Sequence, residues 1–107
     1  MTGTGSNDSL TVDLVDGALV VHGDIDVAGG PVLEAAILER EGDGPIVLDL
    51  SDVFFIDSSG LRSLLGASRR GIDRGTRVVL RDVGQEVLRL LQITGTTGHF
   101  SIEVTGA

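Results

Sequence analysis

The chain has 107 residues, of which 41% are hydrophobic and 22% charged, a balance typical of one globular domain and not of a disordered chain. It contains no cysteine, which excludes a disulfide framework, a thiol nucleophile and a thiolate metal site. Its 16 acidic and 8 basic residues give a net charge of −8, which argues against binding to nucleic acid or to an anionic membrane. The longest apolar runs are too short for a membrane span, and the N-terminus lacks the pattern of a signal peptide. We therefore expect a cytoplasmic protein.

The N-terminal part predicts a tail followed by a β-hairpin. Residues 1–8 are mostly small and polar, so we expect a disordered tail ahead of a single domain over 9–107. Apolar and polar residues alternate over 10–14, the pattern of a half-buried strand. The pair Asp16-Gly17 then favours a tight turn into the apolar run 19–21, which predicts the second strand of a hairpin.

Beyond the hairpin, helical and extended patterns alternate. Helices are predicted from Pro31, which suits a first helical position, to about Arg40, and over 58–73 and 84–93; strands are predicted over 46–50, 77–80 and 100–104. This order predicts an α/β fold, with helices packed on a mixed, mostly parallel β-sheet that opens with a hairpin.

The predicted helix over 58–73 has two distinct faces. Its apolar stripe consists of Leu61, Leu64, Leu65, Ser68 and Ile72. Its arginines, Arg62, Arg69, Arg70 and Arg74, project roughly opposite. A solvated helix face is the ordinary interpretation of these arginines. The alternative is a basic surface that steers docking onto an acidic partner.

The segment Asp57-Ser58-Ser59-Gly60 is the most informative part of the chain. It places two hydroxyl groups between the end of a strand and the start of a helix, the edge at which α/β folds usually bind ligands. The positive end of the helix dipole there favours an added phosphate. From spacing alone, a helix cap without further function is the favoured interpretation.

A second acidic segment, Gly23-Asp24-Ile25-Asp26, precedes the first predicted helix. Two carboxylates at this spacing can bind a divalent ion or act as acid and base. No third ligand lies nearby in sequence, so roles in a turn or a helix cap are the default. If the two strands are parallel neighbours, both acidic segments share one sheet edge, and a phosphate added there meets existing negative charge.

Catalysis is weakly supported. Residues 57–61 do not form G-x-S-x-G, and neither His22 nor His99 can be assigned as a base. The chain contains no lysine, which excludes a P-loop. We expect no catalytic residue, metal or cofactor. A small α/β enzyme using Ser58 or the two carboxylates of Asp24 and Asp26 is the remote alternative.

Three motifs, in order, resemble those of STAS domains, in particular of bacterial anti-sigma factor antagonists. They are Gly23-Asp24-Ile25-Asp26, the run from Phe55 to Leu61 that contains Asp-Ser-Ser-Gly, and the run from Val87 to Gly95. The resemblance spans about residues 10–104.

The resemblance implies a binding module switched by phosphorylation of Ser58. The unmodified form is expected to bind an anti-sigma factor, often a serine-protein kinase, and so to free a sigma factor; phosphorylation ends the complex and a serine phosphatase restores it. The implied partner-binding residues are Asp24, Asp26, Asp57, Ser58, Ser59, Gly60 and Arg62, with Gly60 allowing close backbone approach. The alternative is an unphosphorylated scaffold or transporter-associated module in which Ser58 only caps a helix.

Two departures from the family pattern carry expectations of their own. Gly29-Gly30 stands where the family usually has a threonine, which predicts a lost hydroxyl cap and a looser loop. The sequence stops at Ala107 without the helix that usually follows the last strand. Either the sequence given stops short of that helix, or one sheet face is partly open and favours dimerisation or a partner contact. We expect a monomer or a weak homodimer.

Overall fold

The computed structural model describes residues 3–6, 9–40 and 44–105. Its strands are β1 (Gly3–Ser6), β2 (Leu10–Val15), β3 (Ala18–Gly23), β4 (Ile46–Asp52), β5 (Val78–Arg81) and β6 (Ser101–Glu103). Its helices are α1 (Gly29–Glu39), α2 (Ser58–Asp73) and α3 (Gln85–Ile93), with a short 3-10 turn η1 (Thr97–His99). Within these described ranges, no helix has both the length and the apolar character needed to cross a membrane.

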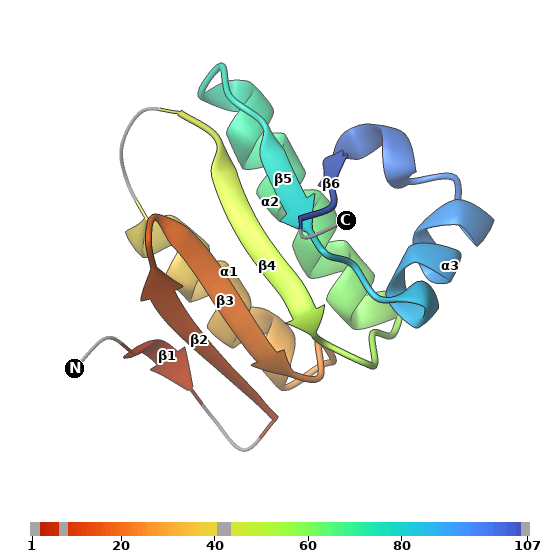
Figure 1. Cartoon of the computed structure of the whole chain (residues 1–107), viewed down its shortest axis with the longest axis horizontal. Helices are drawn as coiled ribbons and strands as arrows, with labels where there is room; N and C mark the ends of the chain where they lie inside the picture. The colour runs from red at the N-terminus through yellow and green to blue at the C-terminus, as the bar shows by residue number, and fades with distance from the viewer. Residues whose placement is uncertain (1–2, 7–8, 41–43, 106–107) are drawn as a thin grey trace.

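The six strands form one sheet in the order β1-β2-β3-β4-β5-β6. The first three strands pair antiparallel, and each later strand pairs parallel with the one before it. Each parallel step passes through a helix in the same direction along the sheet, and right-handed crossovers of this kind place their helices on one face. Figure 1 shows α1 and α2 together behind the sheet. The predicted mixed, mostly parallel sheet opening with a hairpin is confirmed.

The hairpin turn follows from Asp16 and Gly17. Both have positive φ angles, 50° and 83°, and they connect strands whose last pair is Val15 with Ala18. Two central residues with positive φ match the right-handed twist of the strands that they join. The sequence pair Asp-Gly thus fixes the register of β2 and β3.

The structure differs from the prediction at the N-terminus. Gly3–Ser6, expected within a disordered tail over residues 1–8, form strand β1 and pair with β2. Residues 1–2 and 7–8 lie outside the described residues. The backbone supplies the pairing hydrogen bonds without any apolar side chain, and Gly5 lies so close to Val32 of α1 that a Cβ atom would approach it to 3.1 Å. A prediction based on side-chain composition misses a strand of this kind, because its residues have low strand propensity.

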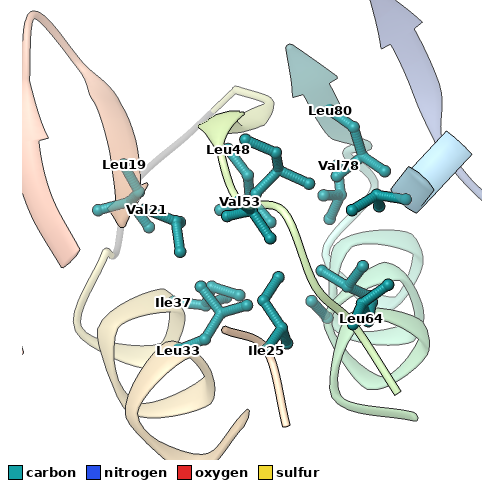
Figure 2. Close-up of a cluster of buried hydrophobic side chains, with 14 of the residues drawn as sticks. Leu19, Val21, Ile25, Leu33, Ile37, Leu48, Val53, Leu64, Val78 and Leu80 are labelled. Atoms are coloured by element: carbon teal, nitrogen blue, oxygen red, sulfur yellow. The ribbon is translucent and has the colours of Figure 1, made fainter. Parts of the chain in front are cut away.

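The core lies between the sheet and helices α1 and α2. Figure 2 shows the strand residues facing the helices, with the loop residues Ile25 and Val53 among them. All are buried: Leu19, Val21, Ile25, Leu33, Ile37, Leu48, Val53, Leu64, Val78 and Leu80. Since Ile25 belongs to the segment before α1 and Val53 to the segment before α2, this core also holds the loops that precede both helices.

The helices agree with the sequence prediction, apart from the start of α1 and the exposure of two side chains on α2. Helix α2 spans the predicted residues, but α1 begins at Gly29, two residues before Pro31. Ile72, placed on the apolar stripe of α2, is 64% exposed and lines a hollow of about 340 Å³ beside η1. Arg70, placed on a solvated face, is half-buried and lies 3.6 Å from a carboxylate oxygen of Glu34, because α1 packs against that side of α2.

Candidate functional site

The two acidic segments meet beyond the ends of β3 and β4. Ile25 and Ile56 form a parallel bridge, in which the Ile25 amide donates to the Phe55 carbonyl at 3.1 Å and the Asp57 amide donates to the Ile25 carbonyl at 3.3 Å. This bridge continues the pairing of the two strands into their loops. The structure therefore brings Gly23–Asp26 and Asp57–Gly60 together at one sheet edge.

Asp57, and not Ser58, caps helix α2. Its carboxylate oxygen Oδ1 accepts a hydrogen bond from the Gly60 amide at 2.9 Å, and its backbone is extended. Ser58 is the first helical residue and is exposed, whereas Ser59 is half-buried. Among the described residues, the Ser58 hydroxyl makes no hydrogen bond, so it is available for modification.

Asp26 holds the start of α1 in the same way. Its Oδ1 accepts hydrogen bonds from the amides of Ala28 at 3.1 Å and Gly29 at 2.7 Å, and its carbonyl accepts from Gly30 at 2.8 Å. The expectation that Gly29-Gly30 loosens this loop is wrong. A Cβ atom on Gly29 would lie 2.3 Å from the Asp24 carbonyl oxygen, so the absence of a side chain allows a tight turn.

Gly60 permits the closest backbone contact of the site. A Cβ atom there would lie 1.8 Å from the carbonyl oxygen of Ile25. Gly60 is buried, so the approach that it allows is between two segments of this chain. Gly60 therefore positions the exposed residues around it and does not itself lie on the surface.

A polar cluster supports the site from between the two helices. The Ser63 hydroxyl donates to Glu34 Oε2 at 2.8 Å, and it also lies 3.4 Å from the Ser59 carbonyl oxygen. The same Glu34 carboxylate faces Arg70 at 3.6 Å. This cluster ties the first turn of α2 to α1, and hence links the two loops that bear the acidic residues.

Two exposed aromatic residues lie beside the site, and no role was predicted for their side chains from the sequence. Phe54 is 72% exposed and Phe55 is 49% exposed. Together with Ile93 and Arg89 of α3 they line a hollow of about 260 Å³. The available signal was two adjacent phenylalanines between the end of a strand and the acidic segment, outside any alternating pattern.

Several candidate catalytic and metal-binding groups hydrogen-bond within this chain. Oδ1 of both Asp26 and Asp57 accepts backbone hydrogen bonds. Within the described ranges, no three His, Cys, Asp or Glu side chains are grouped to hold a metal ion. His22 pairs with Asp52 at 2.6 Å and with Asp13 at 3.9 Å, and in the described part of the chain neither it nor His99 hydrogen-bonds to Ser58. Asp24 and Arg62 remain exposed at the rim.

Comparison with known proteins agrees with this arrangement. A family model described as "Mlab, STAS domain" matches residues 9–103. An anti-sigma-B factor antagonist from Listeria monocytogenes is 31% identical over 87 residues, covering 79% of this chain and 76% of that protein. The crystal structure of an anti-sigma factor antagonist from Mycobacterium paratuberculosis is 35% identical, with a TM-score of 0.67 and coverage of 92% and 89%.

The fold also occurs within larger proteins. The murine anion transporter Slc26a9 matches with a TM-score of 0.67 at 17% identity, covering 94% of this chain and 20% of the transporter, a likeness of fold alone. The family match and the antagonist relatives together settle the assignment: the chain belongs to the STAS domain family, in its anti-sigma factor antagonist branch.

Proposed function

We propose that this protein is an anti-sigma factor antagonist that is switched by phosphorylation of Ser58. In its unmodified form it binds an anti-sigma factor that is also a serine kinase, and so frees a sigma factor in the cytoplasm. Phosphorylation of Ser58 by that kinase ends the complex, and a serine phosphatase restores it. The relatives named as anti-sigma factor antagonists support a role in binding. In this proposal the kinase, and not this chain, binds the ATP that supplies the phosphoryl group.

The observation that carries this proposal is the division of roles between Asp57 and Ser58. Asp57 caps α2, whereas the exposed Ser58 hydroxyl has no hydrogen bond within the described residues. A phosphoryl group can therefore be added to Ser58 without loss of the helix cap. This argues against the alternative in which Ser58 serves only as that cap.

The proposed docking surface combines charged and aromatic residues. Its exposed or half-buried members are Asp24, Asp26, Asp57, Ser58, Ser59 and Arg62, with Phe54 and Phe55 beside them. Aromatic side chains with a polar rim are typical of the parts of an interface that contribute most to affinity. Gly60 supports this surface from beneath.

Electrostatics explains release. A phosphoserine adds about −1.5 to −2 charges at neutral pH, and the segments beside Ser58 already carry Asp24, Asp26 and Asp57. A partner surface that accommodates these three carboxylates meets a much larger negative charge after phosphorylation. The repulsion and the bulk of the added group then act together against the complex.

The test uses the anti-sigma factor of the same organism, identified by mass spectrometry after co-purification with the unmodified chain and then purified. Calorimetry compares the wild type with Ser58→Asp, Ser58→Ala and the neighbouring control Ser59→Ala. We expect Ser58→Asp to weaken binding by roughly tenfold or more. Ser58→Ala and Ser59→Ala bind like the wild type, and only Ser58→Ala resists release when ATP is added. Wild-type affinity of a correctly folded Ser58→Asp variant would overturn the switch and favour an unswitched STAS scaffold.

A further inference from the structure

We propose that Arg62 binds the phosphoryl group of phosphorylated Ser58 within the same chain. The inference rests on the proposed function, because it takes Ser58 as the modified residue. It assigns two successive roles to one guanidinium group. Arg62 faces the partner in the unmodified protein and the phosphoryl group in the modified one.

The positions of the two residues on α2 support this pairing. Ser58 is the first residue of the helix and Arg62 is the fifth, so the two lie one helical turn apart, with Cβ atoms about 5–6 Å from each other. Long side chains in helices lean toward the helix N-terminus, which carries the Arg62 side chain toward Ser58. Both residues are exposed, so no packing contact needs to be broken.

Arg62 is also available, unlike several other arginines. Arg70 faces Glu34 at 3.6 Å, and Arg81 pairs with Glu103 at 2.8 Å. Within the described part of the chain, Arg62 makes no hydrogen bond or ion pair. Its planar group can therefore offer two parallel N–H donors to phosphoryl oxygens, the geometry in which arginine binds phosphate most strongly.

Two amides in the first turn of α2 are already engaged. The Gly60 amide already donates to Asp57 Oδ1 at 2.9 Å, and the Leu61 amide donates to the Asp57 carbonyl at 2.9 Å. The charged side chains of the neighbouring segments are those of Asp24, Asp26 and Asp57, all acidic. Arg62 is the nearest cation along the chain, so the phosphoryl charge is balanced there.

This pairing changes what phosphorylation does to the docking surface. The modification adds negative charge at Ser58 and also withdraws the positive charge of Arg62 from any acidic group of the partner. Loss of the complex then has two electrostatic causes, and both depend on one helical turn of this chain.

The test uses the full chain synthesised with phosphoserine at position 58, without kinase or partner. The pH titration of its phosphorus resonance is compared among the wild type, Arg62→Gln and Arg69→Gln. Because Arg62 favours the doubly charged phosphoryl group, we expect Arg62→Gln to move the titration midpoint upward by about half a pH unit. The matched control Arg69→Gln leaves it unchanged, since Arg69 lies eleven residues on, about 16 Å along the helix and beyond the screening length of about 8 Å.

Equal midpoints for the wild type and Arg62→Gln would overturn the inference, as would equal shifts for Arg62→Gln and Arg69→Gln. A second readout is the Nε–H resonance of Arg62, which we expect to shift when phosphoserine replaces serine at position 58. Since neither kinase nor partner is present, these results do not depend on whether phosphorylation releases an anti-sigma factor. Failure of the switch and failure of the pairing are therefore seen in separate experiments.

Discussion

The carbonyl oxygen of Ile25 occupies the space that a Cβ atom on Gly60 would need, at 1.8 Å from it. This contact and the bridge between Ile25 and Ile56 join the first turn of α2 to the segment that precedes α1. The exposed residues at this edge of the sheet are thus positioned by contacts within the chain.

We expect Gly60→Ala to lower the free energy of unfolding by about 2–4 kcal/mol, because the added methyl group must displace backbone that cannot move alone. Gly66→Ala is the matched control on the same helix. The atom nearest to a Cβ there is Arg70 Nη1 at 3.9 Å, so this change should stabilise the helix by about 0.5–1 kcal/mol. Urea denaturation measures both variants, and a Gly60→Ala variant as stable as the wild type would contradict the close contact.

Substitutions of Asp57 separate its role as a cap from its negative charge. Asp57→Ala removes the acceptor of the Gly60 amide and should lower the free energy of unfolding by about 1 kcal/mol. Asp57→Asn keeps a capping oxygen, so its stability should stay near that of the wild type while one negative charge is lost from the docking surface. Thermal denaturation checks this difference; equal losses for the two variants would show that the charge, and not the cap, stabilises α2.

The exposed aromatic pair should contribute to affinity and not to folding. We expect Phe54→Ala to weaken binding of the anti-sigma factor by roughly tenfold with little change in stability, because the side chain is 72% exposed. Ile72→Ala is the control, since Ile72 is similarly exposed at 64% but lies beside η1. Calorimetric titration of both variants against the same partner tests the surface, and equal affinities for the two would remove Phe54 from it.

Asp82 gives the fold a defined pH dependence. Hydrogen bonds from the Thr105 side chain and backbone amide hold the pKa of Asp82 below its ordinary value of 3.8. Its ionised form therefore stabilises the fold, and this contribution, present above the unfolded pKa, is lost as the pH falls through the lower folded pKa. Thr105→Val removes the hydroxyl donor and should raise the pKa of Asp82, whereas Thr11→Val on β2 should not. Titration of the carboxyl carbon resonance measures this, and the same pKa in all three proteins would contradict it.

Local patterns in the sequence were enough to predict most of the framework. The Asp16-Gly17 hairpin depends on the turn preference of two adjacent residues, and the span of α2 depends on helical periodicity. Both can be recognised from residues that are close together in the sequence. The meeting of the two acidic segments also followed, because neighbouring parallel strands end at the same edge of a sheet. The parallel bridge between Ile25 and Ile56 joins the two segments as expected.

What the sequence did not show depends on contacts between distant segments. Strand β1 exists through pairing with β2, and Arg70 turns toward α1 because Glu34 lies there. Gly29-Gly30 was expected to loosen its loop, but the carbonyl of Asp24 and the hydroxyl of Ser63 occupy the space of any side chain at these positions. Each of these outcomes depends on a neighbour that no local pattern identifies.

The central claim, control by phosphorylation of Ser58, is tested most directly by intact mass measurement and phosphosite mapping of the protein isolated from its own cells. Samples from several growth conditions are compared. The account predicts a single phosphoryl group on Ser58 whose occupancy changes with the condition. A protein without phosphate under every condition, or with phosphate only at another residue, would contradict it.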